Sequence, residues 1–508
     1  MEKQKYIITL DEGTTSCRTI VFDKNANIVS SSQAEFTQYY PKSGWVEHDA
    51  LEIWNTQLAT LQSAKNKAGI KSDNVDSLGI TNQRETVVLW NKETGLPVYN
   101  AIVWQDRRTS EYCDTLKDHV EKVREKTGLI INPYFSGTKI RWILKNVPAA
   151  QKTFEEGKLL AGTIDTWLIW KLTNGKVHAT DVSNASRTLL FNINTMDWDD
   201  ELLELFEVPR SILPEVKSSS EVYGYVEPSH FSLRAQAHVP IAGVAGDQQS
   251  ALFGQLCTKV GMVKNTYGTG CFTLMNIGTK PILSKNKLLT TVAWKLGKEE
   301  TVYALEGSVF IAGAAIQWIR DGLRLIYNAA ESDFYAELAV KDNTHQVYLV
   351  PSFTGLGAPY WDSYSRGAIF GLERGTKKEH IVKATLESIA FQSNDLLKAM
   401  SSDVNKPISV LKVDGGASNS NYLMQFQSSI SKTTVVRPKN VETTALGATF
   451  LAGLATGYYK DLAEIEKFTE VDREFSPQMS DEEVKQLTHG WDVAVSKTLN
   501  WIREVEVK

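Results

Sequence analysis

Hydrophobic and polar positions follow the same pattern in two segments that lie about half the chain apart. Residues 6–23 read YIITLDEGTTSCRTIVFD, and residues 261–278 read GMVKNTYGTGCFTLMNIG. In each segment an apolar strand leads into a turn rich in Gly and Thr, and a second apolar strand follows, which predicts a β-hairpin. Gly13 and Gly268 hold corresponding places in the two turns. The repetition predicts two domains of related structure, one in each half of the chain.

Between and after these hairpins, strand-like and helix-like patterns alternate. Short apolar runs predict strands at 75–81, 102–106, 239–247 and 411–414. Longer patterns predict helices at 107–126, 164–172, 248–256, 306–323, 421–430 and 443–457. Such alternation is typical of α/β layers with mixed sheets. The domain boundary is expected just before the second hairpin, which gives an N-terminal domain of residues 1–254 and a C-terminal domain of residues 255–508.

Composition narrows the class of protein. A chain of 508 residues is too long for one compact core. The net charge of −5 argues against a general nucleic-acid surface, which needs a basic excess. No apolar run is long enough to cross a bilayer, and the N-terminus enters a strand without a secretory segment. The four cysteines form no C-x-x-C pair, which favours reduced thiols and a cytoplasmic location.

The first hairpin offers groups that suit a polyphosphate. Thr14, Thr15 and Ser16 place three hydroxyls in a row, and a turn of this kind can also point backbone N–H groups at an anion. Asp11 could hold Mg²⁺ through water, and Arg18 follows closely enough to reach a phosphate. A plain hairpin in which Asp11 is a turn former explains the same residues. The Walker pattern G-x-x-x-x-G-K-[ST] is absent from the sequence, so a P-loop enzyme is not expected.

Three further segments carry candidate chemistry. Asp247 ends an apolar strand, where it could be a general base for phosphoryl transfer or the N-cap of the next helix, two roles that are compatible. Arg84 and Glu85 give an adjacent donor and acceptor for polyol hydroxyls, with Trp104 as an apolar face, although such a pair is also typical of a solvated salt bridge. The double glycine in 413–419 would let the backbone approach adenine, or simply turn the chain.

Taken in order, these segments closely resemble the FGGY family of carbohydrate kinases, from residue 6 to about residue 459. The resemblance is carried by DEGTTS, NQRET, AGDQQ, YGTGCF and VDGGA, together with YFSGTKIRWI at 134–143 and GAIFGLERGTKKEHIVKATLE at 367–387. It implies two actin-like ATPase domains of the ribonuclease H-like type with a central interdomain cleft. It also implies ATP-dependent phosphorylation of glycerol to sn-glycerol 3-phosphate, with Asp247 as the base.

The resemblance assigns residues to the substrates. The polyol contacts would be Arg84, Glu85, Tyr134, Asp247 and Gln248, with Trp104 and Phe272 along the carbon chain. The nucleotide contacts would be Thr14, Thr15, Ser16, Arg18, Thr269, Gly313, Gln317, Gly416 and Ser420. For the Mg²⁺ ion of such a kinase, Asp11 and Asp247 are the expected carboxylates.

Ser420 departs from the family pattern, because many relatives have Asn there; here Asn419 and Asn421 flank the serine, so the adenine contact stays open. His230 resembles a histidine that a phosphocarrier protein modifies in some relatives, but a histidine without that role is the favoured interpretation. A homo-oligomer, dimer or tetramer, is expected. Two alternatives to glycerol phosphorylation stay open: a pentulose or hexulose kinase of the same family, and a non-enzymatic actin-like ATPase switch.

Overall fold

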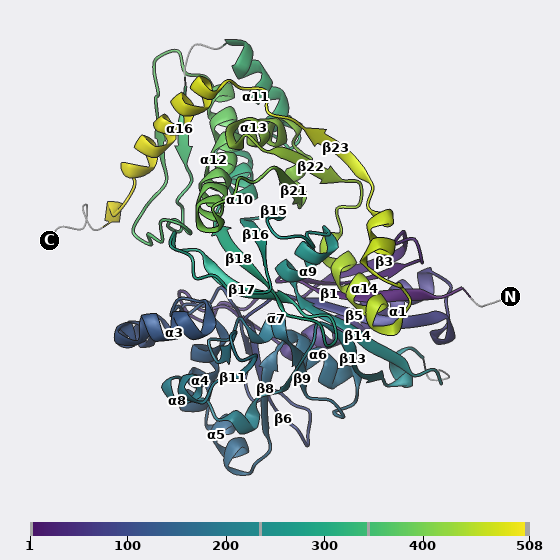
Figure 1. The fold of residues 1–508 in the computed structure, drawn as a ribbon. Helices are drawn as coiled ribbons and strands as arrows, with labels where there is room; N and C mark the ends of the chain where they lie inside the picture. Colours follow the sequence, from purple (N-terminus) through teal and green to yellow (C-terminus); the bar gives the residue numbers. More distant parts are fainter. Residues whose placement is uncertain (1–3, 233–235, 343–345, 503–508) are drawn as a thin grey trace.

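Two large mixed sheets dominate the structure, a computed structural model that describes residues 4–232, 236–342 and 346–502 (Figure 1). The first has the order β13-β14-β5-β1-β2-β3. Its strands are β1 (Tyr6–Glu12), β2 (Ser16–Phe22), β3 (Ile28–Glu35), β5 (Val75–Asn82), β13 (Ser220–Val226) and β14 (Val239–Gly246). The second has the order β17-β18-β16-β15-β21-β22-β23. Its strands are β15 (Val263–Tyr267), β16 (Cys271–Gly278), β17 (Leu289–Trp294), β18 (Val302–Val309), β21 (Val410–Asp414), β22 (Thr434–Pro438) and β23 (Val471–Phe475).

The two sheets share one topology. In the first, β1 pairs antiparallel with β2, β2 antiparallel with β3, and β1 parallel with β5, which is parallel to β14. In the second, β15 pairs antiparallel with β16, β16 antiparallel with β18, and β15 parallel with β21, which is parallel to β22. Both predicted hairpins are therefore confirmed, and each begins a five-strand unit of three antiparallel and two parallel strands. This duplication is the arrangement expected for two actin-like domains.

Small sheets and helices complete the layers. The small sheets contain β4 (Glu47–His48), β6 (Val87–Asn91), β7 (Ala101–Ile102), β8 (Leu159–Thr163), β9 (Ala179–Asp181), β10 (Phe191–Asn192), β11 (Asp197–Trp198), β12 (Glu215–Lys217), β19 (Tyr348–Val350) and β20 (Ala368–Phe370). The helices of the first half are α1 (Ala50–Lys67), α2 (Ser110–Thr115), α3 (Val120–Thr127), α4 (Ser136–Asn146), α5 (Pro148–Glu155), α6 (Ile164–Leu172), α7 (Val182–Ala185), α8 (Asp200–Leu205) and α9 (Asp247–Gly254). Those of the second half are α10 (Gly313–Gln317), α11 (Glu331–Asp342), α12 (Lys378–Val404), α13 (Asn421–Ser431), α14 (Thr443–Thr456), α15 (Leu462–Ile465) and α16 (Asp481–Ser496).

Three predicted elements are wrong in detail. The predicted helix 107–126 is interrupted after α2, because a single 3₁₀ turn precedes α3. The predicted helix 306–323 begins too early, since Glu306 and Val309 belong to strand β18 and the helix starts only at Gly313. The predicted strand 102–106 ends at Ile102, where the chain enters a turn closed by the Asp106 N–H and the Val103 carbonyl oxygen. The early start of the predicted helix 306–323 matters most, because it assigns Glu306, a residue of the candidate site, to a helix and not to strand β18.

Helix α14 joins the two halves. It belongs to the second half of the chain but packs against β1, β5 and β14 of the first sheet, and against α9 (Figure 1). Its small residues permit close approach: a Cβ at Gly79 would lie 2.7 Å from the Ala448 carbonyl oxygen, and one at Gly447 would overlap the Ser250 carbonyl oxygen. A division of the chain near residue 254 therefore separates the strands of the two large sheets, while α14 crosses back to the first of them.

We expect Gly447→Ala to lower the free energy of unfolding by about 1–3 kcal/mol, because the added methyl group has no room against α9. Helix propensity alone would favour Ala and raise the free energy of unfolding. The sign of the measured change therefore tests whether the close packing decides the effect. Thr444→Ala, on the same helix but less buried, is the matched control. Urea unfolding of both variants measures the effect, and a Gly447→Ala protein as stable as the wild type would contradict the close contact.

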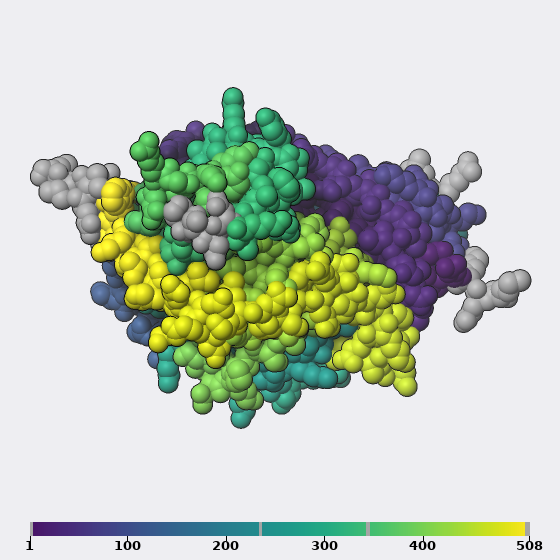
Figure 2. Space-filling model, turned by 90° about the horizontal axis from the view of Figure 1, so that it is seen from above, coloured from purple at the N-terminus to yellow at the C-terminus, as the bar shows by residue number. Residues whose placement is uncertain are grey.

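The C-terminal segment lies across the second half. In the view from above, the last part of the chain forms a continuous yellow band over the green residues of that half (Figure 2). It includes α16, whose buried Trp491 stacks on Phe391 of α12 with ring centroids 5.2 Å apart. Among the described residues, no helix combines the length and apolar character that a bilayer crossing needs.

Candidate active site between the two sheets

A strained turn after β5 presents Arg84 and Glu85. The Thr86 N–H donates to the Arg84 carbonyl oxygen at 2.8 Å, which closes a γ-turn around Glu85, and Glu85 has φ of 62°. A positive φ in a residue other than glycine is costly and needs support from its surroundings. Ser136 Oγ supplies part of that support by donating to the Glu85 carbonyl oxygen at 3.0 Å. The turn directs both side chains inward, where Arg84 is 3% and Glu85 1% exposed.

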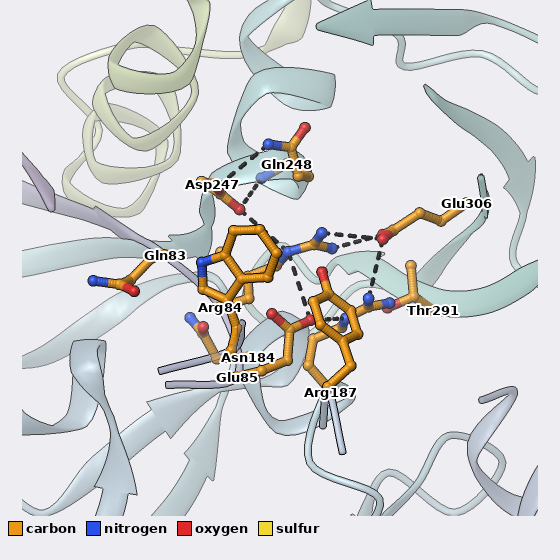
Figure 3. A network of polar contacts seen from close by, with 12 residues as sticks. Gln83, Arg84, Glu85, Asn184, Arg187, Asp247, Gln248, Thr291 and Glu306 are labelled. Atoms are coloured by element: carbon orange, nitrogen blue, oxygen red, sulfur yellow. Dashed lines mark hydrogen bonds and ion pairs between the residues drawn. The ribbon is translucent and has the colours of Figure 1, made fainter. Parts of the chain in front are cut away.

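Arg84 and Glu85 belong to a buried network with Arg187, Asp247 and Glu306 (Figure 3). Arg84 donates through Nη1 and Nη2 to the two oxygens of Glu306, at 2.6 and 3.0 Å. Arg187 donates through Nε to Glu85 at 2.7 Å and through Nη2 to Glu306 at 3.0 Å. The Arg84–Glu85 pair is therefore not a solvated salt bridge. Both residues are held in the interior by ion pairs from the two halves of the chain.

Asp247 lies at the more open end of this network. Helix α9 starts at Asp247 itself and its N-cap residue is Gly246, so the N-cap interpretation of Asp247 is wrong. Its Oδ1 accepts the Gln248 N–H at 2.8 Å and lies 3.2 Å from Arg84 Nε, and a third of its side chain is exposed. Burial raises the pKa of Asp247, against the opposing charges of Arg84 and Lys264. A carboxylate with a raised pKa at a strand-to-helix junction can accept a proton from a substrate.

Lys264 on β15 approaches the same carboxylate from the second sheet. Its Nζ donates to Gln248 Oε1 at 2.5 Å and to Thr266 Oγ1 at 2.9 Å. Burial lowers the pKa of Lys264 to about 8, although Asp414 and Asp247 oppose that shift. Gln248 therefore links the proposed base to a lysine that the sequence analysis did not single out.

Aromatic side chains lie beside Arg84 and Glu85. The rings of Trp104 and Tyr134 meet edge to face with centroids 5.6 Å apart, and Phe272 of β16 is 6.5 Å from Trp104. The Tyr134 ring also lies beside the ion-pair network, with its centroid 5.8 Å from the guanidinium carbon of Arg187. Burial and then the charge of Glu85 raise the pKa of Tyr134. The structure thus brings together the predicted polyol residues from five separate segments and both halves of the chain.

Trp104 also connects this group to the first hairpin. Its Nε1 donates to Thr14 Oγ1 at 3.0 Å. The turn itself is closed by the Gly13 N–H and the Ser16 carbonyl oxygen at 2.9 Å, and Thr15 at its tip is exposed. Arg18 is held by Asp11 at 2.7 Å and by Glu442, next to α14, at 2.6 Å. Arg18 therefore ties this hairpin to the second half of the chain.

The second hairpin turn packs against the start of α10. The Ala312 and Ala314 N–H groups donate to the Thr269 carbonyl oxygen at 2.8 and 3.1 Å. A Cβ at Gly313 would lie 2.6 Å from the Gly268 carbonyl oxygen, so glycine is needed for this approach. Thr269 is exposed, as is Gln317 at the end of α10. Predicted nucleotide residues 269, 313 and 317 therefore belong to one local unit.

The double glycine after β21 has two distinct roles. Gly415 has φ of 85° and lies so close to the Tyr267 backbone that a side chain would clash. Gly416 is exposed, and a Cβ there would meet no atom within 4 Å. Ser420 caps α13 by accepting the Leu423 N–H at 3.0 Å, and its hydroxyl donates to Asp333. The open face at Gly416 suits a flat ligand, whereas the Ser420 side chain is engaged in the helix cap.

Carboxylates near the first hairpin fit a hydrated Mg²⁺ ion. The buried Glu12 Oε2 has no hydrogen-bond partner among the described residues. Burial raises the pKa of Glu12, and the negative charges of Asp11 and Asp247 add to the shift. Within the described ranges no three ligand-type side chains form a ready metal cage. An ion bound through water and phosphate oxygens, with one or two carboxylates nearby, suits this arrangement.

Glu306 and Arg187 are site residues that the sequence analysis missed. Each is the single charged residue in a long apolar or neutral stretch, Glu306 within 302–319 and Arg187 within 182–196. A lone charge in such a stretch is a signal of a buried ion pair, because an unpaired charge would be too costly inside the protein. Lys264 stands alone in the same way within 260–279.

His230 lies away from this network. It is half-buried, its Nε2 is 3.1 Å from Asn174 Oδ1, and its ring meets the edge of Trp54 at 5.1 Å. Two surface cavities, of about 390 and 540 Å³, also lie outside the network, the first near Lys217 and Lys295 and the second near Lys398 and Lys432.

The duplicated sheets and the network between them define a two-domain kinase of the actin-like type, and comparison with known proteins identifies the family. Residues 6–254 match the N-terminal domain of the FGGY family of carbohydrate kinases and residues 263–456 match its C-terminal domain, so the chain belongs to this family.

Similar proteins include a glycerol kinase from Mycoplasmoides gallisepticum, 81% identical over the whole of both chains. The crystal structure of Plasmodium falciparum glycerol kinase with ADP has a TM-score of 0.91 at 38% identity and covers 98% of each chain. A xylulose kinase from Lactobacillus acidophilus shares the fold, with a TM-score of 0.85 at 23% identity over 97% of this chain and 99% of that one.

Proposed function

We propose that the protein transfers the γ-phosphoryl group of ATP to a terminal hydroxyl of glycerol, giving sn-glycerol 3-phosphate. The observation that carries the proposal is the γ-turn at Glu85, which places Arg84 and Glu85 beside Asp247 and an aromatic group. The identity of 81% to a protein named glycerol kinase supports the choice of substrate. So does the similarity to a glycerol kinase structure with ADP, which also supports ATP as the phosphoryl donor.

In this proposal, the polyol and its phosphoryl acceptor hydroxyl are held by distinct groups in the cleft between the domains. Glu85 accepts and Arg84 donates hydrogen bonds to neighbouring hydroxyls, with Tyr134 and Gln248 as further polar contacts. Trp104 and Phe272 cover the carbon chain, which leaves room for three carbons and disfavours a ketose. Asp247 accepts the proton of the hydroxyl as its oxygen attacks the γ-phosphorus in line with the leaving oxygen.

The two hairpins would hold the nucleotide from opposite sides. The Thr14–Ser16 hydroxyls and Thr269 face the phosphates, with Arg18, Gly313 and Gln317 around them, and adenine lies over Gly416 near Ser420. Asp11 and Asp247 would hold Mg²⁺ through water, and the bound ion would neutralise charge on the phosphates. Closure of the domains would exclude water from the transferring group.

A substrate panel tests the function. A coupled assay of ADP release should show a kcat/KM for glycerol well above those for dihydroxyacetone, xylulose, ribulose and gluconate. Identification of the product as sn-glycerol 3-phosphate provides the control for uncoupled ATP hydrolysis. A higher kcat/KM for xylulose or gluconate would indicate a sugar kinase of the same family. ATP turnover that no polyol changes would indicate a nucleotide-driven switch.

The proposal also covers location and partners. Four free, buried cysteines suit a reducing cytoplasm. The protein would form a homo-oligomer, dimer or tetramer, which sedimentation velocity measures. For His230 we favour a packing role against Trp54 over modification by a phosphocarrier protein, since its Nε2 faces Asn174 and the Lys171 carbonyl oxygen.

A further inference from the structure

Glu306 occupies the centre of the ion-pair network without reaching the surface. It lies on β18 of the second sheet and is fully buried. Its carboxylate accepts two hydrogen bonds from Arg84 and one from Arg187, and both arginines belong to the first half of the chain (Figure 3). Burial alone would raise the pKa of Glu306, but the charges of Arg187 and Arg84 lower it to about 2, so it is ionised near neutral pH.

The two arginines that Glu306 binds also contact Asp247 and Glu85, the carboxylates proposed to act on the polyol. Arg84 turns its remaining Nε toward Asp247 at 3.2 Å, and Arg187 turns its Nε toward Glu85 at 2.7 Å. Glu306 thus engages Nη1 and Nη2 of Arg84 and Nη2 of Arg187, and leaves the two Nε atoms for the two carboxylates nearer the substrate. A bidentate arginine–carboxylate pair fixes the plane of the guanidinium as well as its position.

Loss of the Glu306 charge would change which carboxylates the two arginines pair with. Both arginines would then have only Glu85 and Asp247 as anionic partners, and Arg84 would be drawn onto Asp247. That movement would withdraw a donor from the polyol.

We propose that Glu306 is a positioning residue for phosphoryl transfer, which orients Arg84 for the polyol and, through Arg187, holds Glu85 in its strained turn. The proposal rests on the function proposed above. Because Glu306 lies on β18 of the second sheet, whereas Arg84, Glu85 and Asp247 belong to the first half of the chain, the polyol site is complete only when β18 is docked against the γ-turn. The second domain therefore contributes to polyol binding as well as to nucleotide binding.

Glu306→Gln tests this role, because it keeps the shape of the side chain and removes its charge. We expect the kcat/KM for glycerol to fall by about 10- to 100-fold, through a higher KM for glycerol, while the KM for ATP changes little. Direct titration with glycerol should show a matching loss of affinity. Glu306→Asp, which restores the charge but shortens the reach, should recover part of the activity.

Asp395→Asn is the matched control. Asp395 is a nearly buried carboxylate that accepts hydrogen bonds from Tyr360 and Trp491 and takes no part in the network. Its loss should affect stability without a change in the KM for glycerol. If Glu306→Gln does not fold, Glu306→Asp alone should still raise the KM for glycerol selectively.

The outcomes separate the two proposals. A wild-type protein that does not phosphorylate glycerol would refute the proposed function. A wild type that does, together with a folded Glu306→Gln variant of unchanged glycerol affinity, would refute only the role of Glu306. Equal rises in the KM for glycerol and for ATP would show that Glu306 merely supports the domain contact, and would also overturn the positioning role.

Discussion

Replacement of Asp247 by Asn is expected to lower kcat for glycerol phosphorylation by about 10²- to 10⁴-fold, because it removes the proton acceptor and keeps the shape of the side chain. Asn can still accept the Gln248 N–H that Asp247 Oδ1 accepts now. Helix α9 should be retained, since its N-cap residue is Gly246 and not Asp247. Steady-state kinetics at saturating glycerol and ATP measure the effect, and thermal unfolding reports whether the fold is kept.

The pH dependence of the wild type gives a second test of the base. Burial raises the pKa of Asp247, so the carboxyl group should take up its proton at a higher pH than an ordinary aspartate. Since only the ionised form accepts a proton, kcat should fall as the pH is lowered through that raised pKa. The Asn variant should lack this acid limb. A variant with near-wild-type kcat and an unchanged acid limb would leave Asp247 without a catalytic role.

The sequence was a good guide wherever a local pattern decides the structure. The two hairpins were predicted because alternation of apolar residues and Gly-Thr turns are local features, and both are present. Helix α14 was predicted from its small and apolar residues, and its close packing on β5 and β14 follows from the same composition. Strand β14, a continuous apolar run, was likewise predicted.

Prediction failed where burial depends on distant partners. Glu306 was assigned to a helix, because the Ala- and Ile-rich stretch that forms α10 looks continuous with the end of β18. From sequence, a solvated salt bridge stayed open as the alternative for Arg84 and Glu85, since the partners that allow them to be buried lie 102 to 222 positions away. The γ-turn at Glu85 has no local signal either, because a positive φ there is imposed by tertiary contacts and not by glycine.

Removal of the Arg84 side chain is expected to affect both glycerol binding and stability. In Arg84→Ala the KM for glycerol should rise by about 10- to 100-fold, because a charged donor is lost in a site with little water. Glu306 would keep Arg187 as a partner but would lose Arg84, which now donates to both of its oxygens. Breaking a buried ion pair from one side costs about 3–5 kcal/mol, so the free energy of unfolding should fall as well.

The control must therefore separate a lost substrate contact from lost stability. Arg108→Ala is suited to this, because Arg108 is also a buried arginine, paired with Glu47 and Asp106 outside the network. Both variants should unfold at lower denaturant concentration, but only Arg84→Ala should need more glycerol, with little change in the KM for ATP. If Arg84→Ala weakened glycerol and ATP equally while folded, Arg84 would belong to the domain contact alone. The proposed placement of the polyol beside Arg84 would then be wrong.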